Sequence, residues 1–378
     1  MVKDKKRIFF VPVSNVLWIE ATGNYACIHI AKDSHLLRET LAHLEEKLAP
    51  HHFIRVRKSA IVNGACISEI RNITDVEQIV IREAIQYCMP LPAHYMASTL
   101  YPNLETIRTS NDRLTPQKWD IFLYDSRLAN AVGLWPWTDV FFSSELGNLI
   151  VSALSAGPVG VGDALGEINP KNLMTVVRPD GFLIKPDSPL LPIDSMYLID
   201  AANGKGPMIA QAETKFANSF ARYVFSYPRD PAQTEVSVSL TDLGVVGPAF
   251  AFDWIGHTGT LISSGGALSI RLKDGFAYNV VVPVNVDGLA LLGDTEKIVT
   301  LGRQRVSSLE DHGTLTATIK FAPGEDVRTI SGFAAHEPKL KAEKGHLKGF
   351  IYDAKTDMFQ VQMVPGSNGE AVLRLAAH

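Results

Sequence analysis

The stretch from His52 to Asn63, HFIRVRKSAIVN, constrains the fold more than any other part of this sequence. Its apolar members are β-branched and aromatic types that favour strands, and a turn signal, Asn-Gly, ends it. Alternation of side chains along a strand puts Arg55 and Arg57 on one face. Such a strand is either a solvated edge protected by its charges, which composition alone favours, or an edge that contacts an anion such as a phosphate backbone.

The segments around this stretch agree in order and spacing with those of a known family. They are Val11 to Tyr25, Leu37 to Leu41, Leu44 to Leu48 and Phe53 to Asn63. This arrangement resembles the LytTR DNA-binding domain of bacterial transcription regulators over roughly the first quarter of the chain. The resemblance implies a mostly β fold in which loops and strand ends contact double-stranded DNA. It also implies sequence-specific binding in transcription regulation, with a homodimer on repeated half-sites as a further expectation.

The resemblance places the DNA contacts residue by residue. Lys58 stands where family members often carry a base-contacting side chain. Arg55 and Arg57 would either contact the DNA backbone and so position the domain on it, or support the protein structure. A third contact region, expected to be a late strand, falls at Leu91 to Tyr95, where His94 replaces an expected arginine and weakens the contact with phosphate. The complete set of implied DNA contacts is Asn24, Tyr25, Arg55, Arg57, Lys58, Ser59 and His94.

Local patterns add one helix and several strands to this region. Leu41, Leu44 and Leu48 form one stripe behind Thr40, a candidate N-cap, so a helix is expected there. We expect Asn63 to cap a turn, and Phe53, Ile61 and Val62 to lie in the core. Further strands are expected at Asn15 to Ile19, Tyr25 to Ile30, Ala65 to Ile70 and Val76 to Ile81.

A second resemblance begins at about residue 85. The segments Gln86 to Met89, Thr106 to Asp112, Leu134 to Phe142, Ser155 to Gly166 and Arg178 to Gly181 look like late-barrel segments of raffinose synthase and α-galactosidase-like glycoside hydrolases. A helix is expected over 145–156, and β-rich sequence follows residue 200. Candidate strands there are Tyr197 to Ile199, Val236 to Leu240, Thr260 to Ile262, Leu268 to Leu272, Tyr278 to Val284, Leu315 to Phe321 and Gly349 to Tyr352.

The expected fold is therefore multidomain and mainly β, with an α/β part. Residues 1–84 form a LytTR-like domain that extends to about 100 at most, with the seam between Glu83 and Tyr101. Residues 85–200 form a partial (β/α) barrel fragment, and residues 201–378 form a β-sandwich.

The barrel fragment is expected to be catalytically incomplete. A retaining glycosidase needs two carboxylates about 5–5.5 Å apart, and the acid/base position of the resembled family falls at Asn111 or Asp112. A closed barrel takes about 250 residues, whereas roughly 115 are present between residues 85 and 200, so the strand that bears the nucleophile is missing. We expect no hydrolysis by this chain alone, with Asp112 as the one acid/base remnant.

Two other functions compete with DNA binding. The C-terminal part is alternatively a carbohydrate-active fragment or a sugar-binding module, with Trp135, Asp139 and Asp163 as sugar contacts. Asp139 and Asp163 serve equally well as caps of turns, and core packing is the commoner role of a tryptophan. A third interpretation is a fusion whose parts have no joint function.

Charge and cysteine usage agree with these expectations. The net charge is −4, but residues 1–83 carry +2 and the remainder −6, as for a DNA-contacting head on an acidic body. The three cysteines are far apart and form no CxxC pair, so the sequence predicts reduced thiols, no metal and no cofactor. No apolar run approaches the ~20 residues of a membrane helix, and the basic N-terminus lacks a signal-peptide core, so a cytoplasmic location without membrane contact is expected.

Overall fold

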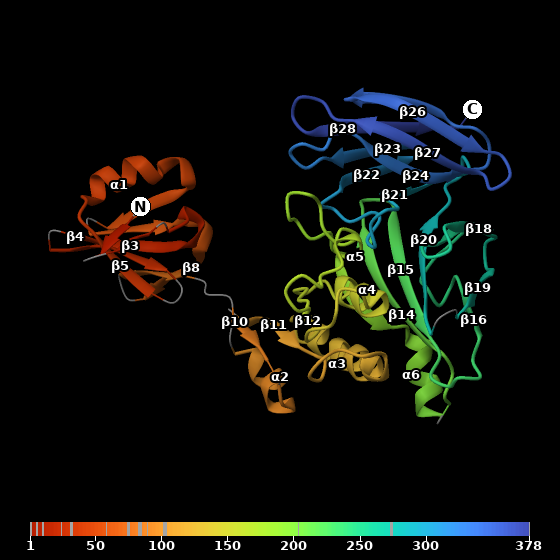
Figure 1. Cartoon of the computed structure of the whole chain (residues 1–378), viewed down its shortest axis with the longest axis horizontal. Coiled ribbons are helices and arrows are strands. Elements are labelled where there is room, and N and C mark those ends of the chain that lie inside the picture. The colour runs from red at the N-terminus through yellow and green to blue at the C-terminus, as the bar shows by residue number, and fades with distance from the viewer. Residues whose placement is uncertain are drawn as a thin grey trace. The chain divides into compact units, whose positions relative to one another are not determined.

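The computed structural model describes the chain except residues 1, 5, 6, 10, 24, 31, 32, 58, 74, 75, 82–84, 89, 101–103, 203, 273, 274 and 378. It describes only the backbone of 2–4, 7–9, 33, 57, 68–73, 76–81 and 85. The chain divides into two compact units, both drawn in Figure 1. The N-terminal unit comprises residues 1–85 and 102–104, and the C-terminal unit comprises 86–101 and 105–378.

A five-stranded antiparallel sheet, in the order β5-β4-β3-β7-β6, organises the N-terminal unit. Helix α1 lies across one of its faces (Figure 1), and two hairpins, β1-β2 and β8-β9, complete the unit. The elements are β1 (Val2–Asp4), β2 (Arg7–Phe9), β3 (Val16–Thr22), β4 (Tyr25–Ile30), β5 (Asp33–Leu37), α1 (Leu41–Leu48), β6 (Phe53–Arg57), β7 (Ala60–Asn63), β8 (Ile67–Ile73) and β9 (Val76–Ile81).

The core of this unit forms where the leucine stripe of α1 meets the sheet. Leu41 and Leu44 pack with the strand residues Ile19, Phe53 and Ile61 in one buried cluster. The side-chain oxygen of Thr40 accepts a hydrogen bond from the backbone N–H of His43, as expected of an N-cap. Both the helix and its cap are therefore confirmed.

The stretch from His52 to Asn63 is a hairpin rather than one strand that ends at Asn63. Strands β6 and β7 pair antiparallel, with Arg57 opposite Ala60, so the tight turn comes in the middle of the stretch. Asn63 has another role, because its Nδ2 donates to Val16 O at 3.0 Å and its Oδ1 accepts from Ala65 N at 3.1 Å. The expectations that Asn63 caps a turn and that Phe53, Ile61 and Val62 are buried are confirmed.

The C-terminal unit begins with a short α/β region. Strands β11 and β12 pair parallel, and a single parallel bridge joins Phe141 to Val161. Within the described residues this series closes no barrel, as expected from its length. Its elements are β10 (Ile85–Tyr87), α2 (Pro92–Ser98), β11 (Leu104–Arg108), α3 (Trp119–Ala131), β12 (Trp135–Trp137), α4 (Leu146–Leu154), α5 (Pro170–Leu173) and α6 (Asp194–Ala201).

A six-stranded antiparallel sheet, in the order β13-β14-β15-β20-β17-β18, follows this α/β region. Strand β13 precedes residue 200 and pairs with β14, which follows it, so one sheet takes strands from both sides of that position. The strands are β13 (Ser188–Pro192), β14 (Met208–Lys215), β15 (Phe220–Tyr227), β17 (Ala249–Asp253), β18 (Thr258–Ile262) and β20 (Ala277–Pro283), with the separate pair β16 (Glu235–Ser239) and β19 (Ala267–Arg271).

Two four-stranded antiparallel sheets end the chain and are seen together in Figure 1. Alternate residues of β23 and of β27 are buried in one core, the alternation expected of a sandwich. One sheet is β21 (Leu289–Gly293), β24 (Arg328–Ala334), β27 (Met358–Val364) and β26 (His346–Asp353); the other is β22 (Val306–His312), β23 (Thr314–Lys320), β28 (Glu370–Ala376) and β25 (Lys339–Lys344). The mainly β, multidomain fold class is confirmed.

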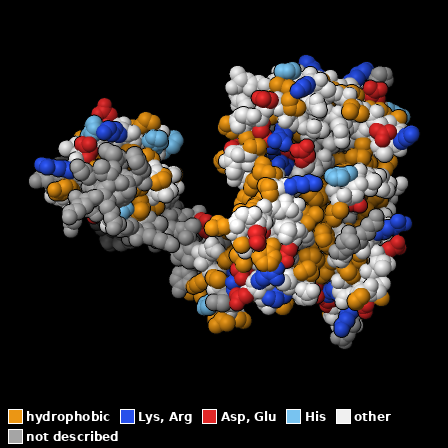
Figure 2. Space-filling view, in the orientation of Figure 1, with side chains coloured by type: hydrophobic (Ala, Val, Ile, Leu, Met, Phe, Trp, Pro, Cys, Tyr) orange, Lys and Arg blue, Asp and Glu red, His pale blue; other side chains and the backbone are white. Residues whose placement is uncertain are grey.

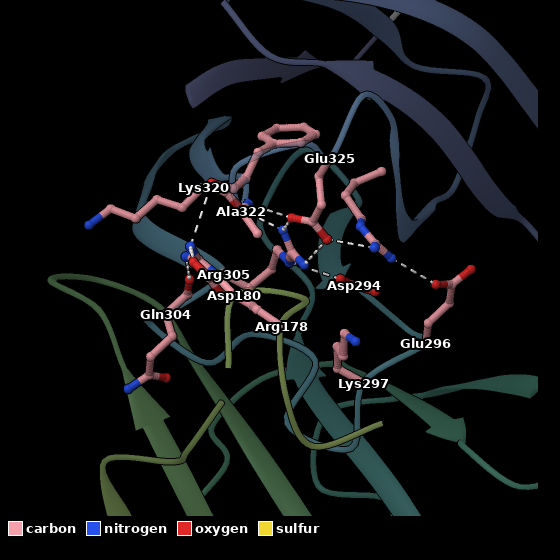
Figure 3. Close-up of polar contacts among 12 residues, drawn as sticks. Arg178, Asp180, Asp294, Glu296, Lys297, Gln304, Arg305, Lys320, Ala322 and Glu325 are labelled. Carbon is pink, nitrogen blue, oxygen red and sulfur yellow. Dashed lines mark hydrogen bonds and ion pairs between the residues drawn. The ribbon is translucent and has the colours of Figure 1, made fainter. Parts of the chain in front are cut away.

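A buried ionic network joins segments of this unit that are far apart in sequence (Figure 3). The fully buried guanidinium of Arg305 holds Glu325 through two hydrogen bonds, of 2.8 and 2.9 Å. Its Nε lies 3.0 Å from Asp294 Oδ2, an ion pair whose angle is too poor for a hydrogen bond. Arg178 donates to Gln304 O, and the ammonium of Lys297 donates to Val177 O. The network therefore connects the segment after α5 to the C-terminal sheets.

Two expected strands are helices in the structure. The segment Tyr197 to Ile199 lies inside α6, and Leu91 to Tyr95 contains the start of α2. Pro92 occupies the first turn of α2, where its fixed φ suits a helix and its missing N–H costs nothing. None of the helices in the described residues reaches the length and apolarity that a bilayer crossing requires.

Candidate nucleic-acid interface

Two hairpin turns lie side by side at one end of the N-terminal sheet. The turn between β3 and β4 is closed by the pair Thr22 and Tyr25. Because β3 runs antiparallel to β7, this end of β3 meets the start of β7, and Ala21 N donates to Ser59 O at 2.8 Å. The structure thus brings together two loops that are separated by more than thirty residues in the sequence.

The described side chains at this end are accessible to a ligand. Tyr25 is 44% exposed, and Ser59 is exposed as well. Gly23 has φ of +59°, and a Cβ added there would meet no other atom within 4 Å. The expected contacts Asn24 and Lys58, and the side chain of Arg57, lie outside the described residues.

Arg55 is tied to helix α1 instead of standing at the turn. Its Nη1 donates to Glu45 Oε2 at 2.9 Å, and the two side chains are 30% and 42% exposed. Arg55 shares a strand face with Phe53, which packs beneath α1, so its side chain starts toward the helix. Sequence reasoning missed Glu45. Its position next to the leucine stripe of α1 is a signal that it can pair with a cation on the neighbouring strand.

His94 lies in the C-terminal unit, on α2 and not on the expected strand. Its Nδ1 accepts a hydrogen bond from Leu91 N at 2.9 Å, and its ring stacks on Tyr87 with centroids 5.1 Å apart. Leu91 is the N-cap of α2, and Tyr87 is the last residue of β10. The ring therefore has a local structural role.

Charges of both signs are mixed over the visible described surface of the N-terminal unit, together with histidines (Figure 2). Of the lysines and arginines in residues 1–83, the described side chains are those of Arg38, Lys47 and Arg55. A net charge of +2 over residues 1–83 agrees with this view.

The second candidate site is a cleft of about 460 Å³ at the end of β11 in the C-terminal unit. Arg108 lies in its wall, 6% exposed, and pairs with Asp112 at 2.8 Å and with Asp139 at 3.2 Å. Burial raises the pKa of Asp125, another lining residue, and burial followed by the charge of Asp125 raises the pKa of Tyr95. A polar, partly desolvated cleft of this kind can hold a small polar ligand.

The expected sugar-contact residues are not gathered around one cavity. The side chain of Asp112 is 82% exposed, unlike the water-excluding setting of a general acid. Asp163 accepts hydrogen bonds from the backbone N–H and the hydroxyl of Ser143, which is a turn-capping arrangement. Trp135 is 41% exposed and opens β12, whereas Asp139 follows the other end of that strand. Arg108, which joins Asp112 to Asp139, was missed by sequence reasoning.

Comparisons with known proteins bear on the two units separately. The family model of the LytTr DNA-binding domain matches residues 6–98, which confirms the first resemblance. A solved LytTr DNA-binding domain from Bacillus cereus, described as that of a methyl-accepting/DNA response regulator, is 28% identical with a TM-score of 0.18. The match covers 18% of this chain and 63% of that one.

Two structures of a GH27 β-L-arabinopyranosidase from Geobacillus stearothermophilus, one of them a variant in complex with arabinose, are 14% identical with TM-scores of 0.39. Each match covers 54% of this chain, and this chain spans about half of the enzyme, 50% and 51%. They are counterparts of the second resemblance, at a similarity too low to carry an argument about activity. None of the curated proteins compared with this chain matches it.

Proposed function

We propose that this protein, whose residues 6–98 match the LytTr DNA-binding domain, binds double-stranded DNA sequence-specifically and regulates transcription. The observation that carries the proposal is the placing of the Thr22–Tyr25 and Arg57–Ala60 turns side by side at one end of the five-stranded sheet. Two adjacent loops on a fixed scaffold can follow a groove and its flanking phosphates together. Such binding places the activity where bacterial DNA lies, in the cytoplasm.

We assign the residues of this end different roles. Lys58 and Asn24 contact base edges, and Ser59 and Tyr25 donate to phosphates. Arg57 contacts phosphate. Binding as a homodimer on repeated half-sites would double the contacts that one copy offers.

The test is selection of duplexes from a random pool by the full chain, followed by titration of the enriched duplex at several salt concentrations. Lys58→Ala should cost about 1–3 kcal/mol and relax the preference at one position, as the loss of a base contact does. Lys47→Ala is the matched control, because it removes the same charge from the exposed last turn of α1, away from the turns. A loss of affinity equal in both variants, or no enriched motif, would refute the assignment.

Arg55 needs a separate comparison, because its ion pair with Glu45 predicts a structural role. If Arg55 only holds α1, Glu45→Ala and Arg55→Ala should lower stability alike and leave the salt dependence of DNA binding unchanged. If Arg55 instead contacts a phosphate, Arg55→Ala alone should reduce the slope of log K against log salt by about 0.9. The two results distinguish a supporting residue from a contacting one.

A second candidate function is sugar binding at the cleft of the C-terminal unit. The observation that favours it is buried Arg108 in a wall shared with Asn111 and Asp112. Calorimetric titration with galactose and with arabinose should show binding, and Asn111→Ala should weaken it. Absence of heat at millimolar sugar would eliminate this function.

A further inference from the structure

Three metal-ligating side chains converge on the β3-β4 hairpin. Glu20 lies directly opposite Cys27, and His29 is two residues further along β4 on the same face. Their ligand atoms all lie within 4.8 Å of one another, and His29 Nε2 is 3.1 Å from Glu20 Oε1. The alternate residues Ile19 and Ile28 are buried with α1, so the three side chains occupy the opposite face of the sheet.

We propose that Glu20, Cys27 and His29 form a binding site for Zn²⁺. A thiolate, an imidazole and a carboxylate are the three protein ligand types that zinc accepts. Bonds of about 2.0–2.3 Å in tetrahedral geometry put ligand atoms about 3.4–3.7 Å apart. Small side-chain rotations would bring the ligand atoms of this hairpin, which lie within 4.8 Å of one another, to those distances. Three protein ligands leave a fourth position for water, which suits an exchangeable ion more than a closed structural centre.

The surroundings preorganise the site. The indole of Trp18 stacks on the imidazole of His29, with centroids 3.9 Å apart and planes 4° from parallel. This contact fixes the plane of the imidazole while Nε2 points to Glu20. Cys27 is a free, partly buried thiol, and the side chains of His29 and Glu20 are 24% and 41% exposed, so an ion can approach the cluster from the side of His29 and Glu20. A hairpin with both ligand-bearing strands already paired needs little ordering to bind the ion.

Sequence spacing alone hides this site, because the carboxylate comes from the neighbouring strand. The pattern Cys-x-His places two donors on one face of β4, and the antiparallel register adds Glu20. His43 on α1 pairs with Glu39, which precedes the helix, with nitrogen and oxygen 3.8 Å apart. This pair has no thiol partner in any described contact and serves as a comparison.

The experiment titrates the reduced full chain with Co²⁺, which replaces Zn²⁺ spectroscopically, and then competes Zn²⁺ against a chromophoric chelator. We expect one equivalent with a thiolate-to-cobalt charge-transfer band. Cys27→Ser and His29→Gln should abolish the band and weaken Zn²⁺ binding by more than about tenfold, since even outer-shell changes reach that scale. Cys66→Ser, Cys88→Ser and His43→Gln should leave both unchanged.

Glu20→Gln serves as a second variant, because this side chain is half-exposed and its amide retains a hydrogen-bonding partner for His29. It should keep the band but lower the affinity for Zn²⁺, with an unchanged circular dichroism spectrum. No band in the wild type, or a band that survives Cys27→Ser, would overturn the proposal. The titration contains no DNA, so its outcome is independent of the proposed function.

Discussion

Arg305→Ala should strongly destabilise the C-terminal unit. The side chain of Arg305 is 0% exposed, and those of Asp294 and Glu325 are 1% and 4% exposed. Without the guanidinium, Asp294 loses its ion pair and Glu325 loses two hydrogen bonds, while Glu325 keeps its contacts with Arg328 and with Ala322 N. Removing one partner of a buried ion pair costs about 3–5 kcal/mol. That is a large part of the ~5–15 kcal/mol that stabilises an ordinary domain.

The assay is urea unfolding of the full chain, monitored by circular dichroism and by tryptophan fluorescence. Trp254 reports on the network, because its buried indole N–H donates to Lys297 O at 2.8 Å. Arg374→Ala is the matched control. Its Nη1 lies 2.8 Å from Glu343 Oε1, but those side chains are 46% and 38% exposed. An exposed pair of this kind contributes about 0–1 kcal/mol.

The double variant Arg305→Ala with Asp294→Ala adds a second criterion. It removes the cation together with one of the carboxylates that the cation neutralises. We therefore expect a smaller loss of stability than the sum of the two single losses, since residues in one ionic network are not additive. If Arg305→Ala costs no more than Arg374→Ala, the network does not hold the unit together and the reasoning from burial is wrong.

Three further outcomes follow from single contacts. Burial alone would raise the pKa of Glu325, but hydrogen bonds from Arg305 and Ala322 N and the nearby guanidinium charges lower it to about 2. The lowering of this pKa from 4.5 contributes about 3 kcal/mol to the free energy of unfolding. This contribution should be complete above pH 4.5 and should disappear as the pH falls toward 2. Urea unfolding at pH 6 and at pH 3 should show the difference, and Glu325→Gln should remove that part of the pH dependence. Thr40→Ala should destabilise the N-terminal unit by about 1 kcal/mol through loss of the cap at His43 N, whereas Thr40→Ser should not, as measured by hydrogen exchange of α1. Asn63→Ala should cost about 1–3 kcal/mol by leaving Val16 O and Ala65 N unpaired, and Asn63→Asp, which keeps the acceptor for Ala65 N, should fall between it and the wild type in thermal unfolding.

Sequence reasoning succeeded where the signal is periodic and local. The leucine stripe and Thr40 predicted α1 because both act within one helix. It failed on short segments, since three apolar residues fit either a strand or a helix, and Tyr197 to Ile199 proved helical. The turn inside the His52 to Asn63 stretch carries no glycine, proline or asparagine, so only pairing of β6 with β7 reveals it.

The candidate sites depended on pairing even more. The resemblance named the two loops, but their adjacency follows from the register of β3 with β7, which no local pattern encodes. The same holds for Arg55 and Glu45, whose contact joins a strand to a helix. Residue types were therefore predictable, and their partners were not.

The contacts of Lys297 have a consequence for the order in which this protein can fold during its synthesis. Its ammonium donates to Met174 O and Val177 O, which precede it by 123 and 120 residues. At about 5–20 residues per second, a ribosome needs roughly 6–24 s to supply that partner. The N-terminal sheet can be complete long before then, because its strands all lie within the first 63 residues. The nascent chain therefore carries a folded N-terminal sheet for many seconds before the ammonium that pairs with the carbonyls after α5 has been synthesised.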